Sequence, residues 1–305
     1  MTAIPIWRGQ RERGSRLLIW LAVTLTLKVG RPIGRALLYP ICAYFILFSR
    51  DAPAASRVYL ARVLGRAPVW KERFRHYHCF AGQLLHRVSM LTGDVDRFEC
   101  VIEGLDLLEA AAAQRRGVLL FGAHLGSFEM MRVLALARFP ARIRVLMVEA
   151  NVEKLASVLA PLNADMAHQV ITLGRPETML EVRDALAAGD VVGLLADRAI
   201  VGERVRPCEF LGARAQFAEG PFILAAAVGV PVLLFSAVQV DGGHYRIRFE
   251  PFAERVLLAR RDRAAALQVM CEHYARWLEA CCRETPYNWF NFYDFWAAAP
   301  LAARI

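Results

Sequence analysis

The chain has 305 residues and is 56% hydrophobic, with a mean hydropathy of +0.32 that is high for a soluble enzyme. Its 38 lysines and arginines exceed its 29 acidic residues and give a formal net charge of +9. Basic charge beside apolar surface favours an anionic membrane face or phosphate-bearing ligands as partners. Nucleic acid is not expected as a partner, because the sequence has no Lys/Arg run and no known reader motif.

Cysteine usage and the missing motifs exclude several classes of site. The seven cysteines, an odd number without paired spacing, indicate a reducing compartment. His76, His78 and Cys79 are close together, but no second cluster completes a zinc site, so no metal is expected. No G-x-S-x-G elbow, G-x-G-x-x-G loop or P-loop occurs, which leaves hydrolase-serine, dinucleotide and P-loop sites unsupported.

Residues 1–50 are expected to form a membrane-associated helical segment. Two uncharged runs, Leu17–Leu27 and Ala36–Ser49, are separated by a basic stretch that includes Lys28 and Arg31. Neither run reaches the ~20 residues that a bilayer-spanning helix needs, and the basic residues resist crossing hydrocarbon. We expect two short helices that enter the cytoplasmic leaflet from one side. A single tilted span and two buried core helices are the alternatives.

Residues 51–95 have an amphipathic helical pattern and are expected to form a helical cap. Asp94 and Asp96 follow this pattern and resemble the metal-holding acidic pair of nucleotide-sugar transferases. Turn chemistry is the favoured explanation for both aspartates, because they follow a helix and aspartate is a common turn residue. The remaining residues, 96–305, are expected to form one α/β domain.

Beyond Glu99, short apolar runs alternate with helical patterns, which predicts a mostly parallel sheet flanked by helices on both faces. The turn sequence Asp241-Gly242-Gly243 predicts that the last strand forms an antiparallel hairpin with its predecessor. The predicted strands are Glu99–Glu103, Val118–Phe121, Arg144–Val148, Gln169–Leu173, Val191–Ala196, Val230–Val238 and Tyr245–Phe249. The predicted helices are Leu105–Arg115, Phe128–Arg138, Val152–Asn163, Glu177–Ala188, Glu219–Val228 and Arg263–Arg283.

The stretch Gly117–Arg132 combines a buried strand, a glycine-containing turn and the start of a helix. His124 lies in the turn, and Glu129 is expected in the first helical turn, where the two side chains can meet. A carboxylate that holds an imidazole in one tautomer makes a histidine a general base for a hydroxyl. Ser127 fits a helix cap. The alternative is that Glu129 only favours the positive helix N-terminus and His124 is an ordinary loop histidine.

Asp197 and Arg198 directly follow the strand predicted at Val191–Ala196. Because ligands bind at the carboxyl ends of strands in open α/β sheets, we expect both residues on the same rim as His124. The stretch from Arg198 to Ala218 has no strong period and is expected to be a long functional or mobile loop, with a solvated connector as the alternative.

Together these segments resemble the bacterial lipid A biosynthesis acyltransferases, within the wider lysophospholipid acyltransferase superfamily. The resemblance covers most of the chain and implies a glycerolipid acyltransferase-like α/β fold with an N-terminal membrane anchor. Ala123–Glu129 matches that family's H-x4-[DE] motif in its glutamate form. The further similar blocks are Leu194–Arg198, Phe210–Ala215, Val228–Val232 and Pro286–Trp296.

Two features depart from the usual pattern of that family. Lipid A enzymes usually have an acidic-rich block after the second motif and a basic tryptophan ending, whereas this chain has Arg198 and the ending Asn291–Trp296. That ending is more similar to the acyltransferases associated with aryl-polyene pigment lipids. The resemblance therefore indicates the chemistry more closely than the acceptor.

The resemblance implies acyl transfer from a thioester of acyl carrier protein or coenzyme A to a hydroxyl of a lipid or glycolipid acceptor. In this mechanism His124 is the general base and Glu129 orients it, with no metal or redox cofactor. The N–H groups of Gly126 and Ser127 are expected to face the oxyanion, and two arginines are expected to bind phosphate. The residues expected to contact substrate are Gly126, Ser127, Arg175, Asp197 and Arg198.

The same resemblance implies an inner-membrane location with the catalytic domain on the cytoplasmic side, where acyl thioesters are made. Three other functions stay open on the sequence. A membrane-bound thioesterase would use the same histidine with water as the nucleophile. A glycosyltransferase would use Asp94 and Asp96, and a non-catalytic lipid-binding protein would need neither site.

Overall fold

The computed structural model describes residues 31–91, 98–113, 116–135, 142–148, 170–199, 202–241 and 243–297. The expected helix at Leu17–Leu27, the expected helix at Val152–Asn163, and the residues Asp94 and Asp96 lie outside the described residues.

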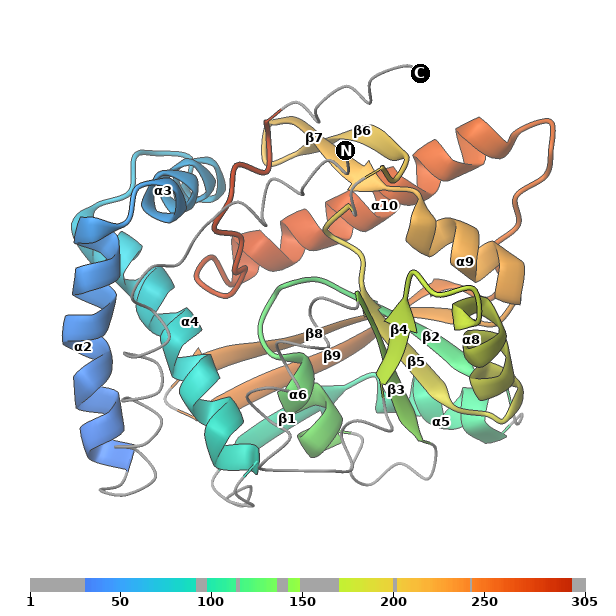
Figure 1. Ribbon diagram of the computed structural model, residues 1–305, viewed down its shortest axis with the longest axis horizontal. Helices are drawn as coiled ribbons and strands as arrows, with labels where there is room; N and C mark the ends of the chain where they lie inside the picture. Colours follow the sequence, from blue (N-terminus) through green and yellow to red (C-terminus); the bar gives the residue numbers. More distant parts are fainter. Residues whose placement is uncertain are drawn as a thin grey trace.

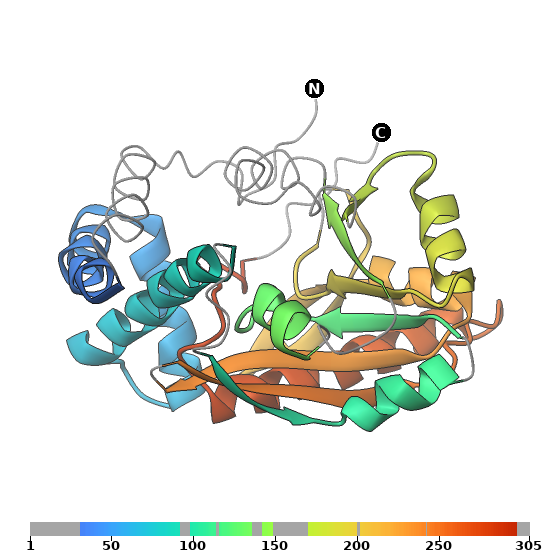
Figure 2. The ribbon, with the colours of Figure 1, turned by 90° about the horizontal axis from the view of Figure 1, so that it is seen from below.

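Within the described residues, three helices precede the sheet: α2 (Arg31–Phe48), α3 (Asp51–Leu64) and α4 (Trp70–Leu91). They are grouped at one end of the sheet in both ribbon views (Figures 1 and 2). In the described part of the chain, no single helix is both long and apolar enough to cross a membrane. The segments Ile33–Phe48 and Asp51–Leu64 meet that criterion only as a pair, bent by 96°. The expected N-terminal membrane helices therefore stay a prediction.

The central sheet confirms the prediction of a mostly parallel sheet flanked by helices. Its seven strands have the order β1-β9-β8-β2-β5-β3-β4, and the only antiparallel neighbours are β8 and β9. The Asp-Gly-Gly turn predicts the β8–β9 hairpin, and the antiparallel pairing of these strands confirms it. The strands are β1 (Glu99–Glu103), β2 (Val118–Gly122), β3 (Ile143–Val148), β4 (Val170–Leu173), β5 (Val191–Leu195), β8 (Val232–Asp241) and β9 (His244–Ala253).

The helices of the α/β region cover the two faces of this sheet. Alternate residues of β2 separate the faces: Leu119 and Phe121 belong to the cluster that includes α8, α9 and α10, whereas Val118 and Leu120 pack with α5 and the start of α6. The full burial of β2 explains its continuous apolar sequence. The helices are α5 (Leu105–Ala113), α6 (Phe128–Met130), α8 (Thr178–Ala187), α9 (Gly220–Val228) and α10 (Arg263–Glu284).

The expected α-helix over Phe128–Arg138 takes a different form. Of its described residues, 128–135, the first three, Phe128–Met130, are α-helical, and a π-helical turn, η2 (Met131–Ala135), follows. The consecutive residues Met130 and Met131 are both fully buried. In an α-helix, consecutive side chains point ~100° apart. The spacing of apolar residues in this stretch is that of an α-helix and does not reveal the wider π-helical turn.

The prediction of a loop between Arg198 and Ala218 is wrong for most of that stretch. A two-stranded hairpin forms there, from β6 (Val205–Phe210) and β7 (Ala213–Ala218). Leu211 and Gly212 make its two-residue turn, and both have positive φ. The alternation was hard to read because the turn lacks the usual Asn-Gly or Asp-Gly pair. The inward-facing positions of β6 and β7 are a mixture of cysteine, phenylalanine and alanine.

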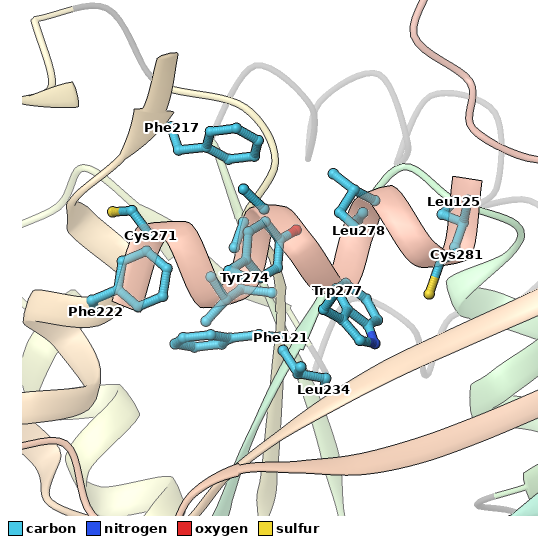
Figure 3. Packing of buried hydrophobic residues seen from close by; sticks show 14 of the residues in the cluster. Phe121, Leu125, Phe217, Phe222, Leu234, Cys271, Tyr274, Trp277, Leu278 and Cys281 are labelled. Atoms are coloured by element: carbon cyan, nitrogen blue, oxygen red, sulfur yellow. The ribbon is translucent and has the colours of Figure 1, made fainter. Parts of the chain in front are cut away.

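The largest cluster of buried residues lies between α10 and the sheet (Figure 3). Tyr274 of α10 is fully buried, and its hydroxyl donates a 2.7 Å hydrogen bond to the carbonyl of Gly122. The same carbonyl accepts from the N–H of Ala196, which follows β5, at 2.9 Å. This helix is therefore bonded to the point where β2 ends. The labelled members of the cluster are Phe121, Leu125, Phe217, Phe222, Leu234, Cys271, Tyr274, Trp277, Leu278 and Cys281.

We expect Tyr274→Phe to lower the free energy of unfolding by about 1–2 kcal/mol, because a buried hydrogen bond is lost while the ring stays in place. Urea unfolding measures the change. Tyr44→Phe is the matched control, since the Tyr44 side chain is 43% exposed and its substitution should change the free energy by less than about 0.5 kcal/mol. Equal stability of the two variants would show that the Tyr274 hydroxyl contributes nothing to stability.

Candidate active site

The turn that carries His124 is fixed by the chain that surrounds it. Gly126 has a φ of +73°, and a Cβ placed there would lie 1.9 Å from the carbonyl oxygen of Ala237. Only glycine fits this close approach without strain. The N–H of Ser127 donates to that same carbonyl at 2.9 Å, so the turn is held against β8.

His124 and Asp197 form a hydrogen-bonded pair across two neighbouring strands. β2 and β5 are parallel and adjacent, so the residues that follow them meet at the same sheet edge. Nδ1 of His124 lies 2.8 Å from Oδ1 of Asp197, and the backbone N–H of His124 donates to Oδ2 at 3.1 Å. Because a carboxylate accepts at Nδ1, the proton of the neutral ring sits there and Nε2 carries the free lone pair. The His124 side chain is 29% exposed, whereas that of Asp197 is fully buried.

A third segment, after α10, completes the support of this pair. The indole Nε1–H of Trp289 donates to Oδ2 of Asp197 at 3.1 Å. The backbone beside it binds the turn on both sides: the N–H of Phe290 donates to the carbonyl of His124 at 2.7 Å, and the N–H of Gly126 donates to the carbonyl of Asn288 at 2.8 Å. The turn that carries His124, the candidate catalytic residue, is thus held between β8 and the C-terminal segment.

The surroundings favour a neutral histidine beside an ionised aspartate. Burial and the positive charge of Arg198 lower the pKa of His124, and the Asp197 carboxylate opposes them in part. Burial alone would raise the pKa of Asp197, but His124, Arg198 and the Trp289 hydrogen bond together lower it to about 2. At neutral pH the imidazole is therefore an available base, oriented by a permanently ionised carboxylate.

The carboxylate that contacts Nδ1 of His124 is Asp197, and a pairing of Glu129 with His124 stays a prediction. Glu129 is in the first turn of α6 as expected, and its Oε2 accepts from the Ser127 hydroxyl at 3.4 Å. Ser127 is the helix cap that was predicted, because its Oγ accepts from the N–H of Met130 at 3.3 Å.

The expectation that Gly126 and Ser127 bind an oxyanion through their N–H groups is wrong in this conformation. Both groups are already donated, to the carbonyls of Asn288 and Ala237 respectively. A backbone N–H points in one direction, so neither is available to a substrate without breaking the turn. Their role in this structure is to hold the backbone on either side of His124.

Arg198 lies beside the pair, close enough for its charge to act on His124. One Arg198 N–H donates to the carbonyl of Phe290 at 2.9 Å, and the guanidinium stacks on the ring of Tyr293. Its Nε is buried, and no described residue accepts a hydrogen bond from it. Arg175 follows β4, the third strand from β2 in the sheet order, or about 14 Å away at ~4.8 Å per strand. A substrate contact by Arg175 stays a prediction.

The histidines and cysteine near residue 76 do not form a metal site. Nδ1 of His76 lies 2.9 Å from the Ser56 hydroxyl, and Nε2 lies 2.9 Å from the carbonyl of Trp289. Burial lowers the pKa of this fully buried histidine to about 4, so it is neutral and structural. Across the described ranges, no three His, Cys, Asp or Glu side chains are grouped to hold a metal ion.

The sequence did not reveal the contacts that two members of the site make. Asp197 was placed on the correct rim but not against His124, because the two are separated by 73 residues and only the strand order brings them together. Trp289 was noticed only within a block that resembles a family segment. Trp289 and its polar neighbours Asn288 and Asn291 are all buried, which no local pattern in the sequence shows.

Comparison with known proteins identifies the family over nearly the whole chain. The sequence profile of the bacterial lipid A biosynthesis acyltransferases matches residues 17–297. A search of curated proteins found no match. The matched range includes the histidine turn, the aspartate after β5 and the tryptophan segment.

Removing the charge of Arg198 and removing the charge of Asp197 should shift the pKa of His124 in opposite directions. Arg198→Gln should raise the pKa of His124, because a cation that disfavours the imidazolium is removed. Asp197→Asn should lower it, because the anion that favours the imidazolium is lost. Titration of 15N-histidine-labelled protein by NMR, with the His124 signals assigned from their absence in His124→Ala, measures both shifts.

Arg276→Gln is the control for total charge, because this arginine is exposed on α10. It should leave the pKa of His124 unchanged. Shifts of the same sign in the Arg198 and Asp197 variants would contradict the assigned electrostatics.

Proposed function

The chain belongs to the bacterial lipid A biosynthesis acyltransferase family, and on that premise we propose how it transfers an acyl group. The donor is a fatty acyl thioester of acyl carrier protein or coenzyme A. The acceptor is a hydroxyl of a lipid or glycolipid. The observation that carries the proposal is the pairing of His124 with Asp197 at the sheet edge, which leaves Nε2 as a base on a partly exposed side chain.

The reaction needs one proton carrier. Nε2 of His124 takes the proton of the acceptor hydroxyl while its oxygen attacks the thioester carbonyl. The resulting tetrahedral intermediate collapses as the carbon–sulfur bond breaks, and the thiolate leaving group takes the proton back from Nε2. Asp197 stabilises the imidazolium that exists between these two steps and keeps the Nδ1 proton in place.

Arg198 is our candidate for stabilising the negative charge that develops on the carbonyl oxygen. Its charge reaches His124, since it lowers the pKa of that histidine. Its buried Nε has no partner within the described residues, and a preorganised cation of this kind is effective at a developing oxyanion. A phosphate on donor or acceptor would use the same N–H groups, as the sequence predicted.

The catalytic assignment separates Asp197 from Glu129. His124→Ala should abolish transfer. Asp197→Asn should lower kcat by roughly 10²–10⁴-fold, the usual scale for a general-base system. Glu129→Gln should cost less than about tenfold, because its carboxylate does not hold Nδ1. The measurement is ester formation from a radiolabelled acyl thioester with a membrane-lipid extract as acceptor.

Each variant is compared only after its thermal unfolding has been matched to that of the unmodified protein. A loss in Glu129→Gln as large as that in Asp197→Asn would return the orienting role to Glu129. Release of free fatty acid without ester product would indicate hydrolysis, and hence a thioesterase.

We propose that the enzyme works at the cytoplasmic face of the inner membrane. Five large apolar side chains of α2 are exposed, namely Ile33, Tyr39, Tyr44, Leu47 and Phe48, with Leu47 and Phe48 at 64% and 71%. Exposed apolar residues on one helix, followed by the exposed Arg50, suit a surface that dips between anionic headgroups. This location brings the histidine to the side where acyl thioesters are made.

Removing the two most exposed apolar residues of α2 tests this contact. The double variant Leu47→Ser and Phe48→Ser should bind phosphatidylcholine–phosphatidylglycerol vesicles at least about tenfold more weakly, because two buried side chains contribute ~1.5–3 kcal/mol each. The matched control is Leu257→Ser with Val269→Ser, at 67% and 61% exposure outside α2. Equal losses in a vesicle co-sedimentation assay would mean that α2 is not the membrane contact.

A further inference from the structure

The segment that follows α10, residues 286–293, makes two sets of contacts. One set is with the catalytic pair and its turn: the indole of Trp289 donates to Asp197, and the N–H of Phe290 donates to the carbonyl of His124. The other set is with α3 and α4, which lie next to the segment (Figure 1). The segment therefore links these two helices to the catalytic pair.

His76 of α4 binds the same residue that donates to Asp197. Its Nε2 lies 2.9 Å from the backbone carbonyl of Trp289. A carbonyl only accepts hydrogen bonds, so Nε2 carries the ring proton, and Nδ1 accepts from the Ser56 hydroxyl at 2.9 Å. Burial lowers the pKa of His76 to about 4. One neutral tautomer therefore makes both hydrogen bonds at neutral pH.

The side chain of Trp289 is also held in one orientation. Its ring is fully buried, and three aromatic rings meet it at steep angles of 68–85°. Edge-to-face contacts of this kind favour one direction of the ring. The three are Tyr59 of α3, Phe210 of β6 and Phe295, with ring centroids at 4.9, 5.3 and 5.0 Å. Together with the bond from His76 to its backbone, this packing aims the indole N–H at Asp197.

The indole N–H fixes the plane of the Asp197 carboxylate. Oδ1 faces Nδ1 of His124, whereas Oδ2 accepts from the backbone N–H of His124 and from the indole, both at 3.1 Å. The last torsion of an aspartate side chain has a broad energy minimum, so its plane is set by its hydrogen-bond partners. A buried carboxylate that loses a donor is destabilised and turns toward other partners. Oδ1 would then no longer be held in line with the imidazole.

We propose that His76 and Trp289 are positioning residues for the acyl transfer: His76 places the tryptophan, and the tryptophan fixes the carboxylate that orients His124. This inference rests on the proposed function, because it takes His124 as the general base. Both residues are fully buried, so they act through Asp197 and not on a substrate. The packing of α4 against the segment after α10 is then a requirement for catalysis.

Trp289→Phe removes the indole N–H and keeps an aromatic ring. We expect kcat to fall roughly tenfold or more and KM for the acyl thioester to stay within about twofold, because the orientation of the base is lost and not substrate binding. The matched control is Trp277→Phe. Trp277 is also buried, and its indole donates at 3.1 Å to a carboxylate outside the histidine pair, that of Glu250. The control should change kcat less than about twofold, in the ester-formation assay described above.

The role of His76 is tested by rescue and by a double variant. His76→Ala should lower kcat about as much as Trp289→Phe, and His76→Gln should restore most of it, because the amide can donate to the same carbonyl. In the Trp289→Phe background, His76→Ala should add less than about twofold, since both act along one path. Additive losses would overturn the assignment of His76. If His76→Ala does not fold, Ser56→Ala should lower kcat roughly threefold or more, and an unchanged kcat there would overturn it equally.

A second readout needs no turnover. The Nδ1–H of His124, bonded to a buried carboxylate, should give an NMR signal in 15N-histidine-labelled protein that exchanges slowly with water. Trp289→Phe should accelerate that exchange at least about tenfold, and Trp277→Phe should leave it unchanged. An unchanged rate in Trp289→Phe would overturn the proposal even where acyl transfer is intact. Accelerated exchange in a protein that forms no ester in any variant would contradict the proposed function and support the positioning role.

Discussion

One buried carboxylate determines how the site is assembled. Asp197 is 1% exposed, and an ionised carboxylate without partners would be strongly destabilising at such a position. It is stable because three donors reach it: the ring and backbone N–H groups of His124 and the indole of Trp289. These donors come from the turn after β2 and from the C-terminal segment. The charge of Asp197 thus joins three parts of the chain that are far apart in sequence.

The same network extends from the sheet to the N-terminal helices. The carbonyl of Trp289 contacts His76 of α4, whose other ring nitrogen contacts Ser56 of α3. Tyr59 of α3 donates to the carbonyl of Pro286 and packs against the Trp289 ring. The segment after α10 therefore lies between the helices and the catalytic turn, as Figure 1 shows for its ribbon. Movement of α3 or α4 relative to the sheet would disturb these contacts.

Sequence reasoning predicted the elements better than the contacts between them. Burial of whole strands makes apolar runs such as Val118–Phe121 visible, and the Asp-Gly-Gly turn marks the β8–β9 hairpin. Glu129 was chosen as the partner of His124 because it is near in sequence. The contact between Asp197 and His124 depends on β2 lying beside β5, a property of strand order that no local pattern records. The β6–β7 hairpin was missed for a local reason, since its turn is Leu211-Gly212.

The pKa of His124 is set by two opposing charges. A general base for a hydroxyl must be neutral before the reaction and tolerate a proton during it. Burial and Arg198 favour the neutral ring, whereas Asp197 favours the imidazolium. With only the arginine, the protonated intermediate would be too costly, and with only the aspartate, more of the histidine would be protonated beforehand. Asp197 and Arg198 are consecutive residues directly after β5. The end of one strand therefore carries both groups that shift the pKa of His124, one upward and the other downward.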